Sequence, residues 1–131
     1  MMNTAVVSVG SNIKPERNVQ AARELVAAEH ELLGCSDFVR TAPIGRPGQP
    51  DFLNGAFLVR TPLSRARFRG SLKAIEYRLG RRRSHDKFAA RRIDLDIVVW
   101  NGQVVDPDYH ARDFVRKACR QLLPELTDSG A

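Results

Sequence analysis

Two segments with apolar residues at helical spacing, each lying between short β-rich segments, constrain the fold more than any other feature of this chain. The helical segments run from Pro15 to about Leu32, with Gly34 as the expected stop, and from about Ser64 to Leu79. The β-rich segments are residues 4–10, 35–41, 52–60 and 93–100. This order of strand, helix, strand, strand, helix, strand predicts an α+β fold. Its expected form is a ferredoxin-like βαββαβ antiparallel sheet with both helices on one face and a C-terminal helical tail at 114–123.

Charge is concentrated in one segment. The 131 residues carry a formal charge of +6, and one domain spanning 1–131 is expected. Residues 78–92 contain seven Lys or Arg and one acid, so this segment alone equals the excess of the whole chain. The sequence therefore predicts a local basic patch, and a polyanion such as a nucleic acid, an acidic membrane or a polyphosphate is the expected partner.

Several classes of protein are excluded by the sequence. No run of about eighteen apolar residues is present, so no membrane partner is expected. The N-terminal residues lack the positive start of a signal peptide. Cys35 and Cys119 match no zinc-binding spacing and are typical of small buried residues in a reducing compartment, which predicts a cytoplasmic location.

The last predicted strand places two carboxylates together. Side chains alternate along a strand, so Asp94 and Asp96 share one face. The apolar set, which must face the helices, is Ile93, Leu95, Ile97 and Val99. Two carboxylates about 7 Å apart repel each other unless a cation lies between them, and hard oxygen ligands suit Mg²⁺. An isolated pair of this kind is more often solvated surface, but here it directly follows the basic segment, and the combination suits phosphoryl transfer.

A second candidate set follows the loop expected at 42–51, which is rich in Pro and Gly. Phe52 and Asn54 share the open face of the next strand, where a ring and an amide could bind a flat heterocycle. The alternative is that the tail helix covers Phe52 and that the loop satisfies the Asn54 amide.

Taken together, these segments resemble the 6-hydroxymethyl-7,8-dihydropterin pyrophosphokinases of folate biosynthesis. The resemblance extends from about Val6 to Leu126, which is nearly the whole chain. It rests on the motifs VGSN at 9–12, RTAPIG at 40–45, QPDFLNG at 49–55, IE at 75–76, LGR at 79–81 and KFAARRIDLDIV at 87–98.

The resemblance implies Mg²⁺-dependent transfer of pyrophosphate from the co-substrate ATP to the hydroxymethyl group of the pterin, with release of AMP. It implies two Mg²⁺ ions held by Asp94 and Asp96. The implied catalytic residues are Arg81, Arg83, Arg91, Asp94 and Asp96. The implied pterin-binding residues are Thr41, Ala42, Ile44, Phe52, Asn54 and Phe114. The implied ATP-binding residues are Lys73, Glu76, Arg83, Lys87, Phe88, Arg91, Ile97 and Arg112.

The chain departs from the family in the region 101–113. A stretch that contacts ATP in the family is shortened near residues 106–112, and His110 does not replace the family's histidine because its spacing from Arg112 differs. One alternative is therefore a weak or repurposed paralogue that binds a pterin or a nucleotide. A nucleic-acid module is a further alternative, but the paired carboxylates on the presumed binding face favour a small-molecule site, so no nucleic-acid partner is expected. We expect a monomer, with a weak dimer as the alternative.

Overall fold

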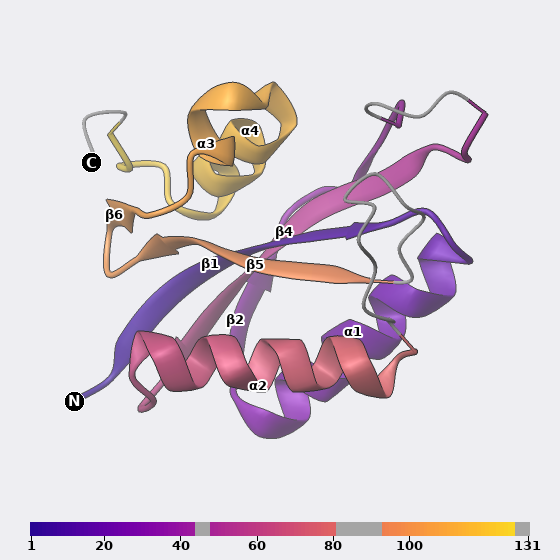
Figure 1. Ribbon diagram of the computed structural model, residues 1–131. Helices are drawn as coiled ribbons and strands as arrows, with labels where there is room; N and C mark the ends of the chain where they lie inside the picture. Colours follow the sequence, from indigo (N-terminus) through magenta and orange to yellow (C-terminus); the bar gives the residue numbers. More distant parts are fainter. Residues whose placement is uncertain (44–47, 81–92, 128–131) are drawn as a thin grey trace.

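The computed structural model describes residues 1–43, 48–80 and 93–127 and contains one antiparallel sheet with helices on both faces (Figure 1). The strands are β1 (Asn3–Ser11), β2 (Glu31–Cys35), β3 (Val39–Thr41), β4 (Phe52–Thr61), β5 (Asp94–Trp100) and β6 (Gln103–Val104). The helices are α1 (Pro15–Glu29), α2 (Arg65–Arg78), α3 (Asp108–Ala111) and α4 (Asp113–Leu122).

The order of the strands confirms the predicted ferredoxin-like fold. The sheet runs β2-β4-β1-β5-β6, and β3 also pairs with β4, so the first strand in sequence is central. Each of these pairings is antiparallel. Helices α1 and α2 lie on one face, while α3 and α4 lie over the other (Figure 1). Since α4 packs against β4 and β1, the C-terminal tail covers part of the second face.

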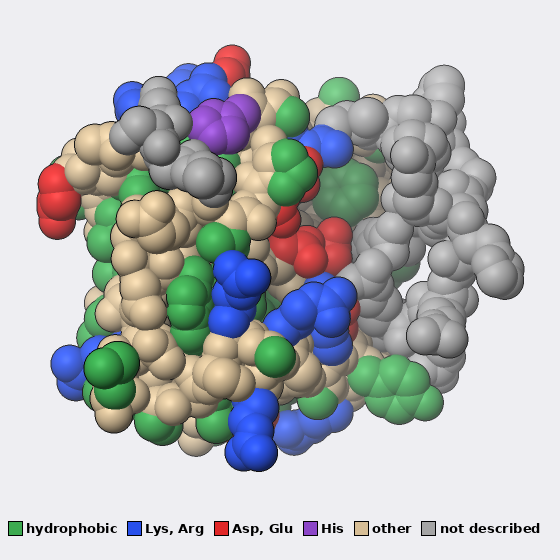
Figure 2. Space-filling view, turned by 60° about the vertical axis from the view of Figure 1, so that its left-hand side comes forward, with side chains coloured by type: hydrophobic (Ala, Val, Ile, Leu, Met, Phe, Trp, Pro, Cys, Tyr) green, Lys and Arg blue, Asp and Glu red, His purple; other side chains and the backbone are tan. Residues whose placement is uncertain are grey.

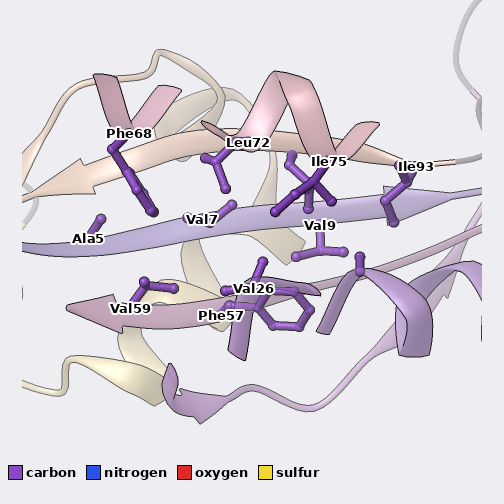
Figure 3. Close-up of a cluster of buried hydrophobic side chains, with 12 residues drawn as sticks. Ala5, Val7, Val9, Val26, Phe57, Val59, Phe68, Leu72, Ile75 and Ile93 are labelled. Carbon is purple, nitrogen blue, oxygen red and sulfur yellow. The ribbon is translucent and has the colours of Figure 1, made fainter. Parts of the chain in front are cut away.

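The main core lies between the sheet and the first two helices. The apolar stripe of α2 (Phe68, Leu72 and Ile75) is fully buried in the cluster that Figure 3 shows, and α2 packs against β5. Burying side chains of this size stabilises the fold by about 1.5–3 kcal/mol each, so this layer fixes α2 against the sheet.

The two helix predictions differ in accuracy. The prediction for α2 is confirmed. The Ser64 hydroxyl accepts a hydrogen bond from the Arg67 amide at 3.2 Å and caps the start of the helix. Gly80 follows the end of the helix with a φ of 97°. The predicted extension of the first helix to about Leu32 is wrong, because α1 ends at Glu29 and the chain enters β2. Leu32 pairs with Val59 in the sheet, so pairing with β4 overrides helical periodicity there.

The strand predicted at 35–41 is only partly confirmed, because β2 ends at Cys35 and β3 begins at Val39. Between them the Ser36 hydroxyl accepts from the Ala56 amide at 2.8 Å and replaces a sheet hydrogen bond. Regular pairing with β4 is therefore interrupted between Cys35 and Val39.

A β-bulge changes the predicted alternation of β5. Val6 pairs with Val99 but Val7 pairs with Ile97, so Val98 is an extra residue. The prediction that Val99 faces the helices is therefore wrong: it is buried on the opposite face with the tail. Ile93 and Leu95 do face the helices, as predicted.

The tail forms a second buried cluster on the other face. It joins Val6, Ala56 and Val98 of the sheet to Tyr109 and Cys119. Burial raises the pKa of the Cys119 thiol to about 12, and neither this cysteine nor Cys35 is in a disulfide. Within the described ranges, no helix is both long and apolar enough to cross a membrane.

Candidate active site

Three strands place one residue each in a row across the open part of the second face. Gly10 of β1 pairs with Asn54 of β4 on one side and with Asp94 of β5 on the other. Strands lie about 4.8 Å apart, so Asn54 and Asp94 are separated by about 10 Å between backbones. A Cβ atom at position 10 would approach Asn54 Oδ1 to 2.9 Å, so glycine makes room for the Asn54 amide over β1. The row therefore forms a floor with an amide at one end and a carboxylate at the other.

The neighbouring row carries the second carboxylate. Ser8 lies between Ala56 and Asp96, and alternation places Asp94 and Asp96 on the same face. The tail buries Ala56, whereas the Asp96 side chain is 41% exposed. Figure 2 shows acidic side chains gathered in a recessed part of the surface, with basic side chains close by. The site thus begins where the cover provided by α4 ends.

The Asp94 and Asp96 pair fits a magnesium ion by its donor chemistry. Both side chains offer hard carboxylate oxygens from a rigid strand, and both are only partly buried. Mg²⁺ is bound in this way by one or two carboxylates while it keeps waters and takes substrate phosphates as its other ligands. The described residues contain no compact group of three or more metal-binding side chains, so phosphate or water would complete the coordination.

Lys73 and Glu76 of α2 bind β5 at Leu95, before the part of this strand that pairs with β6. Glu76 is only 3% exposed, and its carboxylate accepts a hydrogen bond from the Leu95 amide at 2.7 Å. The Lys73 ammonium donates to the Leu95 carbonyl at 2.9 Å and to Asp96 Oδ1 at 3.0 Å. These bonds satisfy the backbone amide and carbonyl of Leu95 and fix the position of Asp96.

The ammonium of Lys73 remains charged in this setting. Burial alone would lower its pKa, but the carboxylates of Asp96 and Glu76 outweigh burial and raise the pKa. Lys73 is also bound to Glu76 Oε2 at 3.0 Å. A positive charge is therefore held permanently beside Asp96.

The amide end of the row is organised by β3 and the loop before β4. Asn54 Nδ2 donates to Thr41 Oγ1 at 2.5 Å, so the two predicted pterin-binding residues are in contact. Phe52 shares one face of β4 with Asn54, pairs with Thr41 of β3 and is half-buried. Asn12, which is buried, donates to Gln49 Oε1 at 2.9 Å and ties the loop to the end of β1.

The tail brings Arg112 and Phe114 to the junction between α3 and α4. Arg112 Nε lies 3.4 Å from Asp108 Oδ1, so this predicted ATP-binding cation already has a carboxylate partner. Phe114 packs at the border of the tail cluster and is half-buried. The structure thus places these two predicted residues together on the tail.

Other predicted site residues are placed less directly. Ala42 is exposed after β3, while Ile97 packs at the border of the helix-side core, on the face opposite the carboxylates. Six predicted site residues lie outside the described residues: Ile44, Arg81, Arg83, Lys87, Phe88 and Arg91.

Comparison with known proteins identifies the family. The family model of 7,8-dihydro-6-hydroxymethylpterin-pyrophosphokinase matches residues 6–124, which include every described residue of the site. The chain belongs to this family of pyrophosphokinases. The predicted resemblance is thereby confirmed.

Curated relatives of the pyrophosphokinase family are similar over nearly the whole chain. Three relatives are named 2-amino-4-hydroxy-6-hydroxymethyldihydropteridine pyrophosphokinase. The protein from Pseudomonas aeruginosa is 33% identical, with 96% of this chain and 84% of the relative covered. The protein from Haemophilus influenzae is 30% identical, with 95% and 84% covered. The protein from Synechocystis is 33% identical, with 95% and 68% covered.

Two residues near the site of this pyrophosphokinase were not assigned a role from sequence. Asn12 belongs to a motif that supported the resemblance, but its contact with Gln49 depends on how the loop folds back. Asp106 follows β6, and its carboxylate accepts from the Asp108 amide at 2.8 Å at the start of α3. A capping signal at Asp106 could have been read from the sequence, whereas its closeness to Asp96 could not.

We predict that Asp106→Asn stabilises the protein at neutral pH. Burial raises the pKa of the Asp106 carboxyl, the carboxylates of Asp108 and Asp96 raise it further, and the Asp108 amide lowers it. Because the folded pKa exceeds the unfolded one, stability falls as pH rises through the interval between them. Asparagine retains an acceptor without the charge, so we expect a rise in Tm of about 2 °C at pH 7 that shrinks as the pH falls below this interval. Thermal unfolding across pH, with exposed Asp37→Asn as the control, tests this; a lower Tm at pH 7 contradicts it.

Proposed function

We propose that this chain transfers pyrophosphate from ATP to the hydroxymethyl group of 6-hydroxymethyl-7,8-dihydropterin, depends on Mg²⁺ and releases AMP. The observation that carries the proposal is the row Asn54, Gly10 and Asp94, in which an amide and a carboxylate lie on the two strands that flank Gly10. A flat pterin at the amide end would direct its hydroxymethyl group toward the carboxylate end. The family match and the relatives' names support the same reaction.

In this proposal the chain positions the two substrates and supplies no strong base. Asn54 and Thr41 recognise the edge of the pterin, and Phe52 offers a ring against its face. Asp94 and Asp96 hold two Mg²⁺ ions, as the resemblance implies. Bound Mg²⁺ would neutralise charge on the phosphates and favour ionisation of the attacking hydroxyl. The contribution of the described residues is therefore orientation and charge placement, as phosphoryl transfer requires.

The reaction is tested by product analysis. Purified protein with ATP, Mg²⁺ and the reduced pterin should form AMP and the pterin diphosphate in equal amounts, and chelation by EDTA should stop the reaction. Release of ADP, or of AMP without the pterin product, would contradict pyrophosphate transfer. Sedimentation of the active protein tests the expected monomer against the weak dimer.

A pterin-binding paralogue with little transferase activity is the second candidate. It is favoured by Arg112, whose guanidinium is already paired with Asp108 rather than left for a phosphate. Calorimetry separates the two functions: this alternative predicts pterin binding with no heat from ATP and Mg²⁺ at millimolar concentration. Binding of both substrates supports the enzyme.

A further inference from the structure

The ammonium of Lys73 is held by three acceptors at the edge of the proposed metal site. They are Glu76 Oε2 at 3.0 Å, the Leu95 carbonyl at 2.9 Å and Asp96 Oδ1 at 3.0 Å. An ammonium group has three donors, so this set satisfies all of them. The geometry is that of a fixed charge and not of a solvated lysine.

Two of these three acceptors do not depend on the metal site. Glu76 is buried and is itself fixed by the Leu95 amide, and the Leu95 carbonyl belongs to the backbone of β5. If Asp96 turned to another partner, Lys73 would keep these two bonds. The lysine is therefore anchored beside Asp96 independently of what Asp96 binds.

The third acceptor is a proposed magnesium ligand. Lys73 occupies Asp96 Oδ1 and offsets one of the two negative charges of the Asp94 and Asp96 pair. A divalent ion at this pair meets a positive charge within a few ångströms. The ion carries two positive charges, so its repulsion by the ammonium is unfavourable even after screening by the solvent that reaches both groups.

We propose that Lys73 is a positioning residue that keeps the affinity of the empty site for divalent ions low and so couples metal binding to nucleotide binding. The proposal rests on the proposed function. Without nucleotide, the ammonium holds Asp96 in place and repels the ion. When a nucleotide is bound, its negatively charged phosphate oxygens attract both Lys73 and the ion, and this attraction compensates the repulsion between the two cations. The metal then enters with the nucleotide instead of before it.

The decisive measurement is the affinity for Mn²⁺ in the absence of nucleotide, followed by electron paramagnetic resonance. Lys73→Gln should bind Mn²⁺ about tenfold tighter than the wild type, because the repelling charge is gone. Arg69→Gln removes the same charge from an exposed position one turn earlier on α2 and should remain within about twofold of the wild type.

The same titrations with a non-hydrolysable ATP analogue test the coupling. The wild type should gain more Mn²⁺ affinity from the analogue than Lys73→Gln does, and the analogue should gain equally from Mn²⁺ by linkage. A general effect on folding would change stability without this selective change in coupling.

The possible failures are distinguishable. Equal Mn²⁺ affinity in the wild type, Lys73→Gln and Arg69→Gln would overturn the role of Lys73 but leave the proposed function. No Mn²⁺ binding by any of these proteins, even with the analogue, would overturn the metal site and the proposed function.

If Lys73→Gln does not fold, the ¹⁵N signal of the Lys73 ammonium in the wild type tests the coupling instead. It should shift more on addition of Mg²⁺ with the analogue than with Mg²⁺ alone, and equal shifts would overturn the coupling.

Discussion

Replacing Asp96 by Asn should lower kcat for pyrophosphate transfer by about 10³-fold, which corresponds to about 4 kcal/mol of lost transition-state stabilisation. The substitution removes one of the two carboxylates that the open face offers to Mg²⁺, while the amide can still accept a hydrogen bond from Lys73. The fold should therefore persist, and the loss should fall on catalysis. AMP formation at saturating ATP, pterin and Mg²⁺ measures it.

A matched control separates this effect from a general change of charge. Asp37 is an exposed aspartate between β2 and β3, at the edge of the sheet opposite β5. Asp37→Asn should keep kcat within about twofold of the wild type. A kcat for Asp96→Asn within tenfold of the wild type would contradict the metal role of this carboxylate.

Much of the fold could be predicted because each local signal agreed with the sheet. Ser64 and Gly80 mark the ends of α2, and Asn101-Gly102 forms the expected turn with φ values of 50° and 81°. The end of α1 was mispredicted because Leu32 satisfies the helical spacing equally well, and only its pairing with Val59 places it in a strand.

The sequence allowed us to predict the residue types of the candidate site and the shared face of its two carboxylates, but not its contacts between distant segments. Alternation placed Asp94 and Asp96 on one face, and the structure agrees. The bulge at Val98 could not be foreseen, because it is set by the register of β5 against β1. The contact of Lys73 with Asp96 joins residues 23 apart in sequence and depends on where α2 crosses the edge of β5. Such contacts arise from packing and leave no local pattern.

Replacing Glu76 by Ala should lower the free energy of unfolding by about 3 kcal/mol. The change removes a buried carboxylate that holds both the Leu95 amide at 2.7 Å and the Lys73 ammonium at 3.0 Å. It leaves a buried donor without its acceptor and a lysine without its closest anchored counter-charge. Urea unfolding monitored by circular dichroism measures the loss, and hydrogen exchange at the Leu95 amide should become faster.

The variant Glu76→Gln distinguishes support of β5 from direct contact with ATP. Glutamine keeps the size of the side chain and an oxygen that can accept from Leu95, so its loss of stability should be about 1 kcal/mol. If Glu76 acts by supporting the edge of β5, Glu76→Gln keeps the KM for ATP near the wild-type value. A large rise in that KM with little loss of stability would instead show that Glu76 binds the nucleotide, as the family resemblance implies.

Because Glu76 is buried and bonded to Lys73 and Leu95, we expect the KM for ATP to stay near the wild-type value. The resemblance and the geometry thus assign this residue different roles, and the comparison of stability with KM decides between them.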